Sequence, residues 1–155
     1  MSARITIRSA GLRDISEVCR LIADHALYEK AAVDREATKL RLDSEMRSES
    51  PRVRIWIAVD EKDIACGYAS ATIDFSTWTA VPYLHMDCLY VDQDCRGSGI
   101  GSLLLQRLKE FAREAGINEI QWQTPDWNRR ARDFYLRAGA TESAKARFKL
   151  ALSAS

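Results

Sequence analysis

A glycine-rich stretch that contains one arginine has the residue types and spacing best suited to chemistry. Residues 94–102 read Asp-Cys-Arg-Gly-Ser-Gly-Ile-Gly-Ser and lie between an apolar run and a long amphipathic segment. Gly97, Gly99 and Gly101 permit positive φ angles and close approach of a ligand, so several N–H groups can converge at a helix start. Arg96 adds a guanidinium suited to phosphate. We therefore predict that this stretch, called the glycine loop below, cradles an anion.

The glycine loop differs from two well-known phosphate-binding loops. It has no Gly-Lys-Ser/Thr, which excludes a Walker-type nucleotide loop, and its Gly-x-Gly-x-Gly spacing is not the Gly-x-Gly-x-x-Gly of a dinucleotide fold. Taken alone, the loop also fits a flexible turn between a strand and a helix. The surrounding sequence decides between the two interpretations.

An acidic residue interrupts the apolar run that precedes the glycine loop. Asp87 lies in the middle of residues 83–91, where an uncompensated charge is costly if the strand is buried. It is a functional carboxylate, a hydrogen-bonded buried acid or a bulge residue. Strand periodicity places His85 on the face of Asp87 and Cys88 on the opposite face, so Cys88 is predicted to pack among apolar side chains.

The periodicity of the sequence predicts the elements that position these residues. Helices are predicted from apolar residues at helical spacing, from a capping box at Asp14 and Glu17, and from end signals at Gly116 and Gly139. In chain order we predict a strand (4–8), two helices (14–30 and 34–46), a hairpin (54–59 and 64–74), a loose link (76–82), a central strand (83–91), a helix after the glycine loop, a strand (119–123), a helix (128–138) and a strand (146–152). This order indicates an α/β (α+β) fold around a central sheet.

Length and composition narrow the class of protein. The 155 residues predict one domain, 1–155, and the 23 basic and 22 acidic side chains leave no net field for nucleic acid or membrane. No run approaches the ~20 apolar residues of a membrane span, and the N-terminus lacks a signal-peptide pattern. Small-molecule chemistry is therefore expected, without nucleic acid or membrane as a partner.

The cysteines show neither a disulfide nor a metal-binding pattern. No Cys-x-x-Cys pair and no ligand spacing with His25 or His85 occurs among Cys19, Cys66, Cys88 and Cys95. The sequence therefore predicts a reduced, cytoplasmic chain that binds no metal.

The chain resembles the GNAT superfamily of acetyl-CoA-dependent N-acetyltransferases. The loop from Arg96 to Gly101 matches the family pattern Arg/Gln-x-x-Gly-x-Gly/Ala, and it joins a strand to a long helix. Within the superfamily the chain is most similar to the diamine and thialysine group, which includes spermidine/spermine N-acetyltransferase. The residues that match this group are Leu27-Tyr28-Glu29-Lys30, Gly67-Tyr68-Ala69, Trp127-Asn128, Phe134-Tyr135 and Gly139-Ala140.

The resemblance implies a single GNAT domain, acetyl-CoA as cosubstrate and a homodimer. The implied sheet is mixed and mostly antiparallel, with about six to seven strands and about four flanking helices. The implied coenzyme A contacts come from a strand edge, the glycine loop and a later turn: Leu89, Tyr90, Val91, Arg96, Gly97, Ser98, Gly99, Ile100, Gly101, Ser102 and Asn128.

The resemblance also implies the reacting groups. Tyr135 occupies the position of a general acid, and Asp87 that of a base that acts through water. The related group has a second acid directly after its base. This chain has Cys88 there, and the loss of one carboxylate weakens recognition of a long polycation.

The acceptor site is implied by residues at the end of the first helix. Tyr28 and Glu29 occupy positions that contact the amine in the related group, and Trp78 and His85 are further candidates for this site. An acid and aromatic rings together suit a cationic amine, through charge and cation–π contact.

The predicted function is transfer of acetyl from acetyl-CoA to a primary amine of a small cationic substrate, either a diamine or polyamine or a lysine-like amino acid. Such an amine, with a pKa of ~10.4, is almost fully protonated near neutral pH, so a carboxylate can both attract it and take its proton. Alternatives within the class are an aminoglycoside-type amine or a protein amine. The alternative from another class is a non-catalytic acetyl-CoA sensor.

Overall fold

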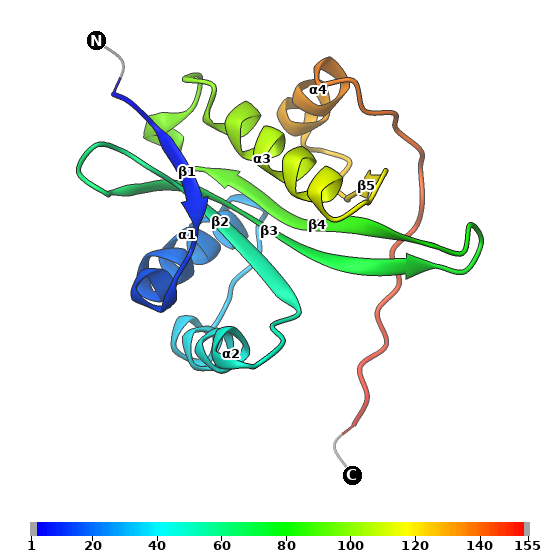
Figure 1. Ribbon diagram of the computed structural model, residues 1–155, viewed down its shortest axis with the longest axis horizontal. Helices are drawn as coiled ribbons and strands as arrows, with labels where there is room; N and C mark the ends of the chain where they lie inside the picture. The colour runs from blue at the N-terminus through cyan, green and yellow to red at the C-terminus, as the bar shows by residue number, and fades with distance from the viewer. Residues whose placement is uncertain (1–2, 154–155) are drawn as a thin grey trace. The chain divides into compact units, whose positions relative to one another are not determined.

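A five-stranded sheet with helices on both faces forms the first of two units in the computed structural model, which describes residues 3–153 (Figure 1). The two units are Met1–Gln123 and Thr124–Ser155. The strands are β1 (Thr6–Ser9), β2 (Val53–Val59), β3 (Ala65–Ser76), β4 (Val81–Val91) and β5 (Ile120–Gln121). The helices of this unit are α1 (Ile15–Tyr28), α2 (Arg35–Arg47) and α3 (Ile100–Glu114), with short 3-10 turns at Leu12–Asp14 and Gln93–Cys95.

The strands lie in the order in which they follow along the chain. Strands β1 to β4 pair antiparallel with their neighbours, and β5 runs parallel to β4 at Leu84↔Ile120 and His85↔Gln121. The predicted α/β class with a mixed, mostly antiparallel sheet is confirmed. The number of strands in residues 3–153 is five rather than the predicted six to seven.

The hairpin of β3 and β4 is longer than predicted. Its ladder continues to Ser76↔Val81, so residues 76–82 form strand ends and a turn rather than a loose link. The prediction was wrong because this end of the hairpin has apolar side chains that stay exposed, such as Phe75 and Val81. Without one buried face, the sequence shows no clear alternation.

Helices cover both faces of the sheet, and α1 and α3 are amphipathic. Helices α1 and α2 cover one face and α3 covers the other (Figure 1). On the first face, Val18 and Leu21 of α1 pack with Ile57 and Tyr68 of the sheet. On the other face, the rings of Trp56 and Phe111 lie 5.1 Å apart. The packing of helices against both faces of the sheet fixes the position of β4, and therefore of the glycine loop that follows it.

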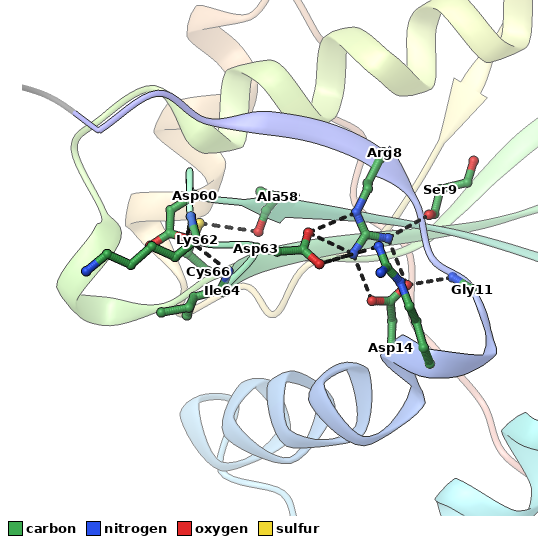
Figure 2. A network of polar contacts seen from close by, with 11 residues as sticks. Arg8, Ser9, Gly11, Asp14, Ala58, Asp60, Lys62, Asp63, Ile64 and Cys66 are labelled. Atoms are coloured by element: carbon green, nitrogen blue, oxygen red, sulfur yellow. Dashed lines mark hydrogen bonds and ion pairs between the residues drawn. The ribbon is translucent and has the colours of Figure 1, made fainter.

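An ion-pair network anchors the start of α1 to β1 (Figure 2). Arg8 Nη1 and Nη2 donate to the two carboxylate oxygens of Asp14 at 2.8 and 2.9 Å, and Asp63 joins the guanidinium at 3.1 Å. Asp14 also accepts a hydrogen bond from Gly11 N at 2.7 Å. The predicted capping box of Asp14 and Glu17 is therefore wrong, because a bidentate guanidinium binds the carboxylate more strongly than a helix N–H does.

Within its described residues, 124–153, the second unit contains one helix. Helix α4 (Arg129–Arg137) begins at Asn128, whose side-chain oxygen accepts a hydrogen bond from Ala131 N at 3.2 Å. It ends before Gly139, which has a φ of 95° and thus takes the left-handed conformation that suits a helix end. Both boundaries were predicted from the sequence.

The chain after α4 is extended and exposed. Phe148, Leu150 and Leu152 alternate as in a strand, and their exposed fractions are 91%, 86% and 86%. The predicted strand over 146–152 is wrong for the described residues. The alternation is present, but no adjacent strand within the described chain completes its backbone hydrogen bonds.

Two further observations concern the class of protein. All four cysteines are free thiols. Residues 3–153 contain no helix with the length and apolar character of a membrane span.

We expect replacement of Asp14 to destabilise the fold. The pKa of Asp14 lies below its usual range, chiefly because Arg8 donates to the carboxylate. The ionised carboxylate thus stabilises the fold above about pH 4, and this contribution is lost as pH falls through the lowered pKa. Asp14→Asn should lower the free energy of unfolding by about 2 kcal/mol at pH 7, measured by urea titration.

The matched control is Asp43→Asn, which removes an exposed carboxylate from its pair with Arg47 within α2. We expect no measurable loss of stability in that variant. Equal effects of the two substitutions would contradict the anchoring role of Asp14.

Candidate active site

The glycine loop connects the end of β4 to the first turn of α3. Gly97 and Gly99 have φ angles of 81° and 82°, which only glycine adopts without strain, and space around both is open. Gly99 precedes the helix without a side-chain cap, so the N–H groups of the first turn, at residues 100–102, have no acceptor within the helix. The predicted anion cradle requires this backbone geometry.

The side chain of Arg96 holds the loop against the end of α1. Its Nε donates to Val91 O at 2.9 Å, and its guanidinium lies 4.5 Å from the ring centre of Tyr28 and 5.4 Å from that of Tyr90. Arg96 therefore positions the loop, in addition to adding positive charge to it. This contact also brings Tyr28 to the loop.

One edge of β4 is only partly covered. Strand β5 pairs with it at Leu84 and His85, and no strand of the described chain continues along that edge at Leu89–Val91. On the other edge, Leu89, Tyr90 and Val91 pair with Ala69, Tyr68 and Gly67 of β3. The backbone of an edge strand can pair with an extended ligand.

A register shift places Asp87 outside the ladder of β3 and β4. Ser70 pairs with Cys88 and Ala71 pairs with Met86, so Asp87 is the extra residue of a bulge. Its side chain is exposed. The argument from the cost of a buried charge is therefore wrong, and the alternative interpretation of Asp87 as a bulge residue is confirmed.

The bulge also changes the environment of Cys88. Its thiol donates a hydrogen bond to Asp87, with 3.7 Å between Sγ and Oδ2, and the hydroxyls of Tyr68 and Ser70 interact with the thiol and lower its pKa. Burial, and next the charge of Asp87, raise the pKa of Cys88 to about 11. Cys88 packs beside the apolar core, but the prediction of purely apolar packing is wrong.

His25 is a site residue that the sequence did not identify. Its Nδ1 lies 3.1 Å from the Tyr68 hydroxyl, and its Nε2 lies 2.8 Å from Glu29 Oε2. Its ring stacks on Tyr90 with 5.2 Å between ring centres. The spacing of His25 and Glu29, four residues apart on one helix, was the available signal, whereas the contact with Tyr68 joins residues 43 apart.

The burial of this cluster changes its titration. Burial lowers the pKa of His25, while the charges of Glu29 and Asp87 act in the opposite direction. Burial also raises the pKa of Tyr68 far above its usual range. At neutral pH the imidazole is therefore neutral and the phenol keeps its proton.

Trp78 lies far from Asp87, whereas His85 lies two residues from Asp87 on β4. Trp78 lies on the β3–β4 turn and is 95% exposed. The strand from the start of β4, at Val81, to Asp87 spans six residues, or about 20 Å, so Trp78 lies at least that far along the hairpin from Asp87. His85 Nδ1 lies 3.7 Å from Asp74 Oδ2. Of the predicted acceptor contacts, the structure thus brings together Tyr28 and Glu29, at the end of α1.

The remaining predicted residues belong to the second unit. Asn128 is 8% exposed and caps α4, so it has a structural role in addition to the predicted ligand contact. Tyr135 lies on α4, where its ring meets that of Phe134 edge to face at 5.2 Å. Residues 3–153 contain no cluster of three His, Cys, Asp or Glu side chains arranged for a metal.

Comparison with known proteins identifies the class. Residues 20–140 match the model of the acetyltransferase (GNAT) family, and the chain belongs to this family. The chain is 30% identical over 151 residues to a bovine thialysine N-epsilon-acetyltransferase, which covers 93% of this chain and 88% of the bovine protein. It is 33% identical over 121 residues to the thialysine N-epsilon-acetyltransferase of Caenorhabditis elegans, with coverage of 77% and 72%. The protein is an N-acetyltransferase.

Solved structures show the same fold. An aminoglycoside acetyltransferase from an uncultured soil metagenomic sample, solved with sisomicin, superposes with a TM-score of 0.77 at 20% identity. The match covers 96% of this chain and 97% of that one. At this level of identity the likeness concerns the fold alone.

Proposed function

We propose that the enzyme transfers acetyl from acetyl-CoA to a primary amine of a small cationic substrate, a diamine or polyamine or a lysine-like amino acid. The observation that carries the proposal is the arrangement along β4. The bulged carboxylate of Asp87, the open strand edge and the glycine loop follow one another within residues 87–102. A base, a site for an extended arm and an anion cradle are the parts that this reaction needs.

The proposed cofactor contacts are of two kinds: N–H groups that bind the charged pyrophosphate, and a strand edge that pairs with the pantetheine arm. The glycine loop, Arg96–Ser102, holds the pyrophosphate through the N–H groups at the start of α3. The edge at Leu89–Val91 pairs with the pantetheine arm, and Asn128 is a further proposed cofactor contact. Acetyl-CoA supplies an activated acyl group as a thioester.

The proposed chemistry is direct transfer, with proton handling by two side chains. Asp87 takes a proton from the ammonium through water, since the neutral amine is the nucleophile. A strand N–H near Leu89 stabilises the developing negative charge on oxygen. Tyr135 gives a proton to the departing thiolate, whose pKa of about 8.5 requires only modest help.

The acceptor is proposed to bind between Asp87 and the end of α1. Tyr28 and Glu29 lie there, and the C-terminal end of a helix favours a cation. The names of related proteins, thialysine N-epsilon-acetyltransferase and spermidine/spermine N(1)-acetyltransferase-like protein 1, support a small cationic amine.

The alternative acceptors make different predictions for the site. An aminoglycoside or a peptide also presents a primary amine, and a relative named for each type of acceptor exists. A sensor that binds acetyl-CoA without turnover has no need of a base at Asp87. Release of coenzyme A thiol in the presence of a panel of amines separates these possibilities. Turnover that selects small diamines or lysine analogues supports our proposal, whereas turnover only with the antibiotic or the peptide contradicts it.

We predict that Tyr135→Phe and Asp87→Asn each lower kcat by about 100-fold, the usual contribution of a positioned acid or base. Steady-state thiol release measures the effect, and a thermal melt confirms that each variant is folded. Tyr83→Phe, on the same strand as Asp87, is the matched control and should retain full activity. Unchanged kcat in both site variants would exclude the proposed proton transfers.

We predict that Gly99→Ala weakens acetyl-CoA binding at least tenfold. Gly116, at the other end of α3, has a φ of 71° and open space around it, so Gly116→Ala imposes the same kind of backbone strain. Both variants should lose about 1–2 kcal/mol of stability. Only Gly99→Ala should lose affinity in isothermal titration, and equal losses of affinity would count against the anion cradle.

We also propose a homodimer, in which the apolar residues after α4 are covered by a second copy. Phe148, Leu150 and Leu152 support it, because exposed apolar side chains at alternate positions suit strand pairing. Light scattering should give twice the monomer mass, and Leu150→Asp should reduce it. A wild-type monomer at micromolar concentration contradicts the dimer.

A further inference from the structure

We infer that His25 is the positioning residue that fixes Glu29 as a second anionic contact for an acceptor with two cationic groups. The inference rests on the proposed acetylation of a small amine and specifies its acceptor site. It assigns a role to a buried polar cluster that the reaction itself does not use.

Continuous contacts join Glu29 to the bulge of β4. His25 Nε2 meets Glu29 at 2.8 Å, and His25 Nδ1 meets the Tyr68 hydroxyl at 3.1 Å. Cys88 packs against the buried cluster that contains Tyr68, and its Sγ lies 3.7 Å from Asp87 Oδ2. The two carboxylates are therefore tied to one buried framework, on different elements of the fold.

The framework is rigid because its centre is buried. Tyr68 is 1% exposed, and the His25 side chain is 16% exposed, stacked on Tyr90. The Glu29 side chain is 27% exposed, so its carboxylate also faces solvent. Because the fixed His25 ring already orients the Glu29 carboxylate, less side-chain entropy is lost when a ligand binds to it.

The charge state of His25 decides what Glu29 offers to a ligand. The groups that face His25 are Glu29 on its own helix, Tyr68 on β3, Asp87 and Tyr90 on β4, and Arg96 of the glycine loop. With a neutral ring and an ionised Glu29, Nε2 carries the hydrogen and Nδ1 accepts from Tyr68. The ring then orients the carboxylate without cancelling its charge.

A neutral orienting partner is what distinguishes this site from an ordinary ion pair. An arginine or lysine in place of His25 compensates Glu29 and leaves no net charge for a ligand. Here the negative charge of Glu29 is reinforced by the C-terminal end of α1, where the N–H of Glu29 caps the carbonyl of His25 at 3.0 Å. A second cation of the acceptor completes the site.

The test compares 1,4-diaminobutane with 1-aminobutane, which differ in one amino group. His25→Leu should raise KM for the diamine about tenfold, the loss expected for one charge-assisted contact, with kcat unchanged. KM for the monoamine should stay the same. Glu29→Gln should raise KM for the diamine at least as much as His25→Leu does, and the double variant should be no worse than Glu29→Gln alone.

The pH profile separates positioning from simple packing. The pKa of His25 lies below its usual value because the ring is buried, so protonation occurs only as pH falls through this lowered pKa. Protonation cancels the charge of Glu29, and KM for the diamine should then rise. That rise should disappear in His25→Gln, which keeps hydrogen-bonding groups but does not titrate. An identical profile in His25→Gln, or equal effects on the two amines in His25→Leu, would overturn the inference.

An NMR measurement that needs no turnover distinguishes the role of His25 from the proposed acetylation reaction. The chain has two histidines, so the ring nitrogens of His25 can be assigned by ¹⁵N NMR with His25→Gln as reference. At pH 7.5 we expect the neutral Nε2–H form, and a shift on addition of the diamine but not of the monoamine. The Nδ1–H form, or no response to the diamine, overturns the inference even in an enzyme that acetylates amines. Lack of turnover with a diamine-specific shift would instead contradict only the proposed function.

Discussion

The register shift between β3 and β4 is the constraint on which the candidate site depends. One extra residue in β4 turns Asp87 out of the ladder and brings Cys88 to the face of α1. Both consequences follow from the same bulge, because a single inserted residue reverses the alternation of side chains beyond it. The exposed carboxylate and the buried polar cluster are thus two products of one backbone feature.

Helices on both faces of the sheet contact β4 or the loop that follows it. On one face α1 brings Tyr28, His25 and Glu29 to the end of β4, and Arg96 stacks on Tyr28. On the other face α3 starts directly after the glycine loop, so its first-turn N–H groups point to the loop. The anion cradle and the acceptor contacts therefore share β4 as a common support.

Much of this architecture could be predicted from the sequence, since helices, hairpins and glycine turns are local features. The boundaries of α2 and α4 and the glycine loop before α3 followed from caps and periodicity. Features that depend on distant residues could not be predicted. Arg8 binds the Asp14 carboxylate in place of the helix N–H groups, and Tyr68 contacts His25 across the fold. A bulge at Asp87 was one of three interpretations that the sequence left open, and the pairing with β3 decides between them. Resemblance to the acetyltransferases supplied the function, but not these contacts.

The central claim is that β4 and the start of α3 together form the acetyl-CoA site. A crystal structure with coenzyme A bound tests it most directly. The account predicts the pyrophosphate against the N–H groups of residues 100–102 and the pantetheine arm along Leu89–Val91, with the thiol near Asp87. Coenzyme A bound away from the glycine loop, or an arm that does not follow β4, would contradict it.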